Sequence, residues 1–391
     1  MLAVLATYGT TGDVQPLLGL AAELSRRGHI VKFAAPPEFG PRVSGLGFDF
    51  VSLGPPMDMA DRSVYGRATS AGDPLQSIQQ TLPLVIRDTP QMVEELAGAT
   101  EGADVLISLP YQLAGRIVHE LKDIPLVVVF LSPFGGFGRG FSGASSRLVN
   151  ELRAQYGLKE ITDPFGPAGS PTHLGLCAVS SELFRRPRHW PERHRITGFF
   201  FFDEDRPVDP DLERFVESGE PPIVVSFGSV IHESPEHLAE IVSMAIQKAG
   251  KRAVVQQGWT GLKFQSLLPK TVHAADFVPH RWLFSRAACV VHAGGAGTTA
   301  ATLRAGIPSV VVPHVLDQFL WATLLRERGC ASDVIPYGEL TAERLGIAIE
   351  LACTPTSQKA AALFPEIINR EGGASLAADI IESQYSSKAG H

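Results

Sequence analysis

Residues Val290–Gln318 read VVHAGGAGTTAATLRAGIPSVVVPHVLDQ, and this stretch decides the fold. The apolar run 287–291 predicts a strand, and the small residues 293–299 that follow it predict a turn. A helix pattern then runs through residues 300–305 and stops at Gly-Ile-Pro, before a second apolar strand at 309–312. Strand, glycine turn, helix and strand together form one right-handed crossover unit of a parallel sheet.

The turn of this unit suits an anion. Glycines let a ligand approach the backbone closely, and the unpaired N–H groups at a helix start attract negative charge. The spacing matches neither a nucleotide-triphosphate loop, which ends in Lys and Ser or Thr, nor the GxGxxG fingerprint. We therefore expect a phosphate group here. The residues expected to hold it are Gly294, Gly295, Ala296, Gly297 and Thr298.

Polar side chains flank the turn. His292 ends the first strand, where a ring N–H can donate to a phosphate oxygen, while Asp317 and Gln318 follow the second strand at the same carboxyl edge. An acid–amide pair suits the vicinal hydroxyls of a sugar, so this edge predicts a nucleotide-sugar site. Two alternatives remain. His292 can be an ordinary buried histidine bonded to backbone, and Asp317 can cap a helix over 319–328 while also binding.

The same residues resemble a known signature. A His, a glycine run and a terminal Asp-Gln recur in this order and spacing in the inverting glycosyltransferases of the two-domain GT-B fold. The preceding segment FVPHRWLFSRAACVVH, residues 277–292, closely resembles the sterol-glucosyltransferase and antibiotic-glycosyltransferase branches. One departure stands out, because those relatives usually carry a second His where this chain has Ala293. The resemblance implies that His292 contacts the phosphate.

The bulk properties exclude several classes of protein. A chain of 391 residues predicts two domains, and 45% hydrophobic with 19% charged residues is typical of a globular protein. A net charge of -7 without a basic stripe argues against nucleic acid as a partner. Four scattered cysteines predict neither a metal site nor a disulfide framework, and they favour a reducing cytoplasm. The apolar start lacks the basic residues of a signal peptide, and no apolar run approaches the ~20 residues that span a bilayer.

Two Rossmann-like, doubly wound parallel sheets facing each other across a cleft are the expected architecture, of α/β class. Strands expected at 2–7, 29–35, 104–108, 126–131 and 174–179 belong to the first sheet. We expect an acceptor-binding domain over 1–200, a linker over 201–221 that is rich in acidic residues and proline and has no sustained periodicity, and a donor-binding domain over 222–372. In relatives the terminal segment, here 373–391, is a helix that packs back on the first domain.

Asp13 is the candidate catalytic base. It lies in the loop GTTGDVQP, which resembles the GSRGD loop of the antibiotic and sterol enzymes, whose Asp is the proposed base; here Thr10-Thr11 replace Ser-Arg. A base is needed because an alcohol is a poor nucleophile until its proton is removed. The alternative from position alone is that Asp13 caps a helix beginning near Val14.

The donor site needs further contacts. No metal ligands cluster in the sequence, so amides, hydroxyls and His292 are expected to meet the charge of the leaving diphosphate. Ser229, in the FGS turn after a new strand at Ile223, is a candidate, although an ordinary turn residue is an equal alternative. Phe277 and Val278 match the family positions that stack on the uracil and pair with its edge.

The acceptor site is expected in the first domain. Two Gly-rich apolar segments, 54–61 and 132–143, suit a hydrophobic aglycone, with Met57, Phe134 and Phe137 as contacts. Ordinary loops that tuck onto the core are the alternative.

The resemblance implies a metal-independent, inverting hexosyltransferase with no permanent cofactor, acting as a monomer or weak dimer. UDP-glucose is the first choice of donor and a dTDP-sugar the competitor, with a hydrophobic small molecule as acceptor. A sugar-nucleotide epimerase on the same fold and a non-catalytic nucleotide-binding or partner-activating relative remain open. A nicotinamide dehydrogenase is disfavoured because no GxGxxG follows the first strand.

Overall fold

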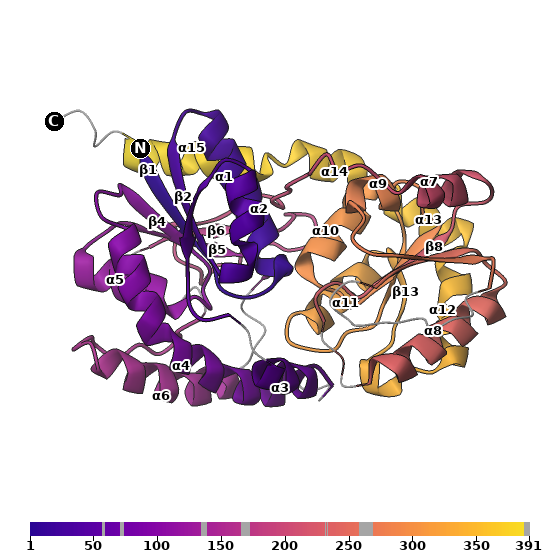
Figure 1. Cartoon of the computed structure of the whole chain (residues 1–391), viewed down its shortest axis with the longest axis horizontal. Coiled ribbons are helices and arrows are strands. Elements are labelled where there is room, and N and C mark those ends of the chain that lie inside the picture. Colours follow the sequence, from indigo (N-terminus) through magenta and orange to yellow (C-terminus); the bar gives the residue numbers. More distant parts are fainter. Residues whose placement is uncertain are drawn as a thin grey trace. The chain divides into compact units, whose positions relative to one another are not determined.

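The computed structural model describes residues 1–56, 59–70, 74–133, 139–165, 173–230, 232, 234–257 and 269–386 (Figure 1). The chain divides into two compact units. The first comprises Met1–Asp58, Thr81–Phe202 and Glu371–His391, and the second comprises Met59–Gln80 and Asp203–Arg370. Each unit contains its own parallel sheet, so the expected fold class is confirmed.

The first unit is built on a seven-stranded sheet of order β3-β2-β1-β4-β5-β6-β7, in which every neighbouring pair is parallel. Its strands are near-continuous apolar runs, as expected of a parallel sheet covered on both faces. The central ones are almost wholly buried. The strands are β1 (Leu2–Ala6), β2 (Ile30–Ala35), β3 (Asp49–Ser52), β4 (Val105–Ser108), β5 (Leu126–Phe130), β6 (Leu174–Cys177) and β7 (His194–Ile196).

The order of this sheet reverses between β1 and β4, which are hydrogen-bonded neighbours. In open α/β sheets the loops that leave the carboxyl ends of the strands at such a reversal form the ligand crevice. The loop after β1 leads to Asp13. The helices of this unit are α1 (Thr11–Arg26), η1 (Pro37–Phe39), α2 (Gly40–Gly45), α4 (Pro74–Ala99) from Thr81 on, α5 (Leu113–Lys122) and α6 (Arg139–Ala154). Helix α3 (Met59–Ser70), which precedes α4 in the chain, belongs to the second unit.

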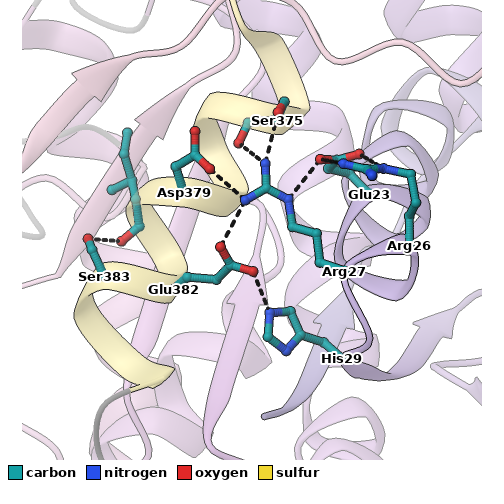
Figure 2. A network of polar contacts seen from close by, with 9 residues as sticks. Glu23, Arg26, Arg27, His29, Ser375, Asp379, Glu382 and Ser383 are labelled. Atoms are coloured by element: carbon teal, nitrogen blue, oxygen red, sulfur yellow. Dashed lines mark hydrogen bonds and ion pairs between the residues drawn. The ribbon is translucent and has the colours of Figure 1, made fainter.

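The terminal helix α15 (Gly373–Tyr385) belongs to the first unit and packs beside α1. Figure 2 shows Arg27, the residue that ends α1, reaching across to it. The Arg27 guanidinium bonds Asp379 at 2.5 Å and Glu382 at 2.8 Å, and Glu382 also bonds His29 at 2.7 Å. Helix α15 is thus held to the end of α1 by a charged network.

The second unit is built on a six-stranded parallel sheet of order β10-β9-β8-β11-β12-β13. The order reverses between β8 and β11, where Ser226 lies opposite His292. The loops after these two strands are therefore the expected ligand crevice of this unit. The strands are β8 (Ile223–Ser226), β9 (Ala253–Gln256), β10 (Val272–Ala275), β11 (Cys289–His292), β12 (Ser309–Val311) and β13 (Ala331–Val334).

Helices cover both faces of this sheet. Alternate residues of β11 show the division, because Val291 packs in a core with α8 and α12, whereas Val290 packs in a core with α7, α9 and α10. This alternation follows from the two-residue period of a strand. The helices are α7 (Pro210–Glu217), α8 (Pro235–Ala249), α9 (His280–Phe284), α10 (Ala296–Ala305), α11 (Gln318–Glu327), η4 (Tyr337–Glu339), α12 (Ala342–Ala352), α13 (Pro355–Ala361) and α14 (Phe364–Arg370).

The segment 201–221, which we expected to be the linker, includes a short helix. It contains α7, which Asp209 caps by accepting a hydrogen bond from the Asp211 N–H at 2.8 Å, with Pro210 in the first turn. Leu212 and Val216 lie four residues apart and are buried in the core of the second unit. A helix this short gives only one apolar pair, which is too little for a periodic pattern in the sequence.

In the stretches that the structure describes, no helix combines the length and apolarity needed to cross a bilayer.

Candidate functional site

The turn between β11 and α10 presents an uncapped helix start. Gly294 takes a φ of 85°, which favours glycine, and Gly295 precedes the helix without any side-chain capping bond. The first N–H groups of a helix have no partner inside it. The N–H groups of Ala296, Gly297 and Thr298 are therefore left to a ligand or to solvent.

The turn is closely packed on one side and open on the other. A Cβ built on Gly294 would lie 2.9 Å from the carbonyl oxygen of Gln318 and 2.9 Å from a methyl group of Val311. A Cβ built on Gly295 or Gly297 would meet no heavy atom within 4 Å. The backbone is thus pressed against α11 on its inner side, while space for a ligand lies beside the two outer glycines.

His292 is fully buried and braces this turn. Its Nδ1 accepts a hydrogen bond from the Gly294 N–H at 3.0 Å, so the ring proton must sit on Nε2. Burial, and to a lesser extent His280, lowers the pKa of His292 to about 3 and keeps the ring neutral. The Nε2–H is a buried donor without a protein partner in the described part of the chain. His292 thus makes the hydrogen bond to backbone that its interpretation as an ordinary buried histidine requires, but its Nε2–H still has no protein partner in the described part of the chain.

Asp317 and Gln318 follow β12, and both side chains are engaged. The carboxylate of Asp317 accepts a hydrogen bond from Trp321 Nε1 at 3.1 Å and makes no capping bond to α11. The amide oxygen of Gln318 accepts from the N–H groups of His314 at 2.8 Å and Val315 at 3.1 Å. Gln318 therefore shapes the loop that follows β12, and the carboxylate of Asp317 is oriented by an indole N–H.

A cluster of rings beside this loop was not foreseen. His314 is fully buried, stacks on Tyr337 at 4.4 Å and lies 4.9 Å from the ring of His232. His314 donates from Nδ1 to the Val312 carbonyl at 2.7 Å, so its Nε2 carries a lone pair. That Nε2 and both ring nitrogens of His232 have no hydrogen-bond partner among the described residues. Burial lowers the pKa of His232 to about 4 and that of His314 well below its usual value.

No pattern in the sequence marks this cluster, because its members leave three different strands and meet only at the sheet edge.

A pocket of about 390 Å³ is lined by the residues that follow β10, Asp276 to Pro279, among others. Phe277 is 52% exposed there, and the guanidinium of Arg206 lies 5.0 Å from the centre of its ring. Val278 is buried, and its carbonyl accepts from Gln256 Nε2 at 3.1 Å. Ser229 is half-buried in the turn after β8. The lining residues are Pro207, Val208, Asp209, Leu212, Gln257, Ala274, Ala275, Asp276, Phe277, Val278 and Pro279.

Asp13 lies in the first turn of α1, at the order reversal of the first sheet. The helix begins at Thr11, earlier than the expected start near Val14, because Thr10 and Asp13 form a capping box. Asp13 Oδ2 accepts from the Thr10 N–H at 2.8 Å, and the Thr10 side chain accepts from Gly12. Asp13 therefore supports the helix start from its third position, while Thr10 is the capping residue.

Models of known protein families match part of each unit. The family model "Glycosyltransferase family 28 N-terminal domain" matches residues 3–134, and "Erythromycin biosynthesis protein CIII-like, C-terminal domain" matches residues 253–373. Sterol 3-beta-glucosyltransferase UGT80A2 of Arabidopsis thaliana is 29% identical over 95% of this chain and 64% of its own length. O-mycaminosyltylonolide 6-deoxyallosyltransferase of Streptomyces fradiae is 29% identical over 98% of this chain and 97% of its own.

The chain has the GT-B fold, and glycosyltransferase family models match part of each of its two units. It spans 64% and 66% of the lengths of two plant sterol glucosyltransferases that it matches. Solved structures agree on the fold. The glycotransferase of kitacinnamycin has a TM-score of 0.75 at 22% identity, covering 98% of this chain and 99% of that one. Glycosyltransferase VinC in complex with dTDP has a TM-score of 0.71 at 20% identity, covering 100% of both chains.

The expected acceptor contacts fall on parts of the chain that the structure does not describe. Met57, Phe134 and Phe137 lie outside the described residues, so the acceptor site stays a prediction. Within the described ranges, no group of three or more His, Cys, Asp or Glu is placed to hold a metal ion.

Proposed function

We propose that this glycosyltransferase moves a hexose from a nucleoside-diphosphate sugar to a hydroxyl of a hydrophobic small molecule, with inversion and without a metal. The observation that carries the proposal is the uncapped start of α10 at the order reversal of its sheet, with open space beside Gly295 and Gly297. A helix start of this kind binds the phosphate groups of nucleotides.

The diphosphate is the leaving group, so the site must stabilise the negative charge that develops on it. The N–H groups of Ala296, Gly297 and Thr298 are fixed by the helix, and such preorganised donors each contribute roughly 3–4 kcal/mol in enzymes where they have been removed. His292 holds the turn through Gly294, and its neutral Nε2–H is a further donor of fixed tautomer. We propose that the Nε2–H of His292 donates to a phosphate oxygen once the ligand has bound and the ring has become accessible to it.

Asp13 is proposed as the base. The Thr10 N–H holds one carboxylate oxygen, which orients the group, and the residue is only half-buried. As the acceptor oxygen attacks the anomeric carbon, its proton passes to the carboxylate and the bond from that carbon to the diphosphate breaks. A single displacement of this kind inverts the anomeric configuration.

The remaining assignments concern the donor. Asp317 and Gln318 are proposed to read sugar hydroxyls, Phe277 and Val278 to receive the base, and Ser229 to assist the diphosphate. The names of the sterol 3-beta-glucosyltransferases support glucose and a sterol-like acceptor, and UDP-glucose remains our first choice. The VinC complex with dTDP supports the competing dTDP-sugar, and the name of the 6-deoxyallosyltransferase of Streptomyces fradiae supports a deoxysugar as the transferred group.

The test uses the full chain with UDP-glucose, dTDP-glucose and a panel of hydrophobic alcohols, with products identified by mass and anomeric configuration. Asp13→Asn should lower turnover by about 10²–10⁴, the range typical of a lost general base. Thr10→Ala is the matched control, because it removes the helix cap and keeps the carboxylate. It should cost about 1 kcal/mol of stability and little turnover.

Equal losses in the two variants would mean that Asp13 acts only through the helix. Conversion of the donor with no alcohol present would favour the epimerase alternative. Nucleotide binding without any turnover across the panel would favour the non-catalytic one.

A further inference from the structure

Two cysteines that the proposed chemistry does not use touch each other in the second unit. The sulfur atoms of Cys289 and Cys353 are 3.8 Å apart. Cys289 opens β11 and is fully buried, whereas Cys353 ends α12 and is half-buried. The two residues are 64 positions apart in the sequence, so the fold alone brings them together.

The two thiols differ in a way that gives them separate roles. The contact with Cys289, followed by the charge of Lys251, lowers the pKa of Cys353 to about 7 against the opposing effect of burial. The hydrogen bond to Cys353 and burial raise the pKa of Cys289 well above its usual value. Cys353, the half-buried member with the lowered pKa, is therefore the thiol that an oxidant can meet first as its reactive thiolate, and the fully buried Cys289 lies behind it.

The local backbone allows the sulfurs to approach. A disulfide needs about 2.05 Å between sulfurs, so the pair must close by roughly 1.8 Å. Cys289 is fixed in the sheet, where it pairs with Ile223. Cys353 lies at the junction of two helices, since the next residue, Thr354, caps α13. The movement can thus come from this junction, without a break in either helix.

We propose that Cys289 and Cys353 form an oxidation site that reacts with a hydroperoxide and closes to a reversible disulfide. The Cys353 thiolate attacks one peroxide oxygen; an S–O bond forms, the O–O bond breaks, and hydroxide leaves. The Cys289 sulfur then attacks the Cys353 sulfur; the S–S bond forms and the S–O bond breaks. The Cys289 proton leaves with the departing hydroxyl as water. In total, two thiols and one hydrogen peroxide give one disulfide and two waters.

The cross-link would join the α12 layer to the amino end of β11. His292 ends the same strand, three residues on, which is about 10 Å away at the rise of a β-strand. The oxidation site is thus separate from the phosphate turn. Its chemistry can be tested without any assay of sugar transfer.

The experiment treats the reduced full-length protein with a few equivalents of hydrogen peroxide under native conditions. We expect the intact mass to fall by two hydrogen atoms, with the peptides of Cys289 and Cys353 linked until a thiol reductant separates them. Cys353→Ser should abolish this rapid loss of thiols. Cys289→Ala removes the contact that lowers the pKa of Cys353, so this variant is oxidised at about pH 9, where an ordinary thiol is largely ionised; it should then leave a sulfenic acid on Cys353 that dimedone traps. Cys330→Ser is the matched control, because this buried thiol contacts the Arg328 carbonyl and no sulfur.

Thiol loss at the same rate in wild type and Cys353→Ser would overturn the proposal. So would a cross-link between any other pair of cysteines, or oxidation of Cys353 to the sulfinic acid with no disulfide. Dimedone capture in Cys289→Ala tests the order of attack even if that variant is less stable than wild type.

Discussion

Replacing Gly297 with alanine tests whether the turn between β11 and α10 binds a ligand, as we propose, or serves only to support the fold. Gly297 is the second residue of α10, and a methyl group there meets no heavy atom within 4 Å. Alanine is favoured over glycine in a helix interior by about 0.8–1 kcal/mol, which is an upper bound for this first-turn position. The free energy of unfolding should therefore stay the same or rise slightly.

Affinity for a nucleoside diphosphate should move in the opposite direction. If phosphate oxygens occupy the space beside Gly297, the methyl group displaces them from the N–H groups of the turn. Losing one hydrogen bond to a charged group costs roughly 1.5–3 kcal/mol, which is about a tenfold to hundredfold rise in Kd. Isothermal titration with UDP and with dTDP measures this change, and thermal unfolding without ligand measures stability. An unchanged Kd in a stable Gly297→Ala protein would refute the phosphate assignment of this turn.

Gly294→Ala is the contrasting variant. A left-handed φ costs an alanine about 1–2 kcal/mol, and the contact with the Gln318 carbonyl adds about 1–3 kcal/mol of overpacking. We expect unfolding to become easier by about 2–5 kcal/mol whether or not ligand is present. If Gly294→Ala is as stable as wild type, the close packing of the turn on α11 is not the constraint that we describe.

Two further predictions concern stability. Arg27→Met should lower the free energy of unfolding by about 1–2 kcal/mol at low salt and by less at high salt, because it removes the contacts to Asp379 and Glu382. A urea midpoint and a melting temperature equal to those of wild type at low salt would contradict this. The free energy of unfolding should also fall as the pH drops from about 6.5 towards 3. Burial lowers the pKa of His292, His173 and other buried histidines, so these rings stay neutral in the folded protein. In the unfolded chain the same histidines bind protons below about pH 6.5, which favours unfolding. At pH 5 each such histidine should lower the free energy of unfolding by about 2 kcal/mol relative to its value well above pH 6.5. Urea unfolding at pH 7.5, 6 and 5 measures this change, and a free energy of unfolding that stays constant over these pH values would contradict the prediction.

Local patterns were enough to predict the elements that repeat along the chain. Strands expected at 29–35, 104–108 and 126–131 lie within one residue of β2, β4 and β5, since each is a short apolar run with polar or turn residues beside it. The apolar strands and the glycine turn before α10 predicted two parallel sheets, because buried parallel strands are continuous apolar runs. The start of α1 was misplaced because the capping box of Thr10 and Asp13 was read as loop.

Side-chain roles depended on contacts between residues far apart in the chain. The sequence by itself determined the class of fold, the position of the glycine turn before α10 and the residues at the sheet edge. Only the tertiary structure decided that Gln318 holds its own loop, that His314 meets His232, and that Cys289 touches Cys353. Secondary structure follows from periodicity within a few residues, whereas the proton positions and reactivity of buried groups follow from neighbours that other strands and helices supply.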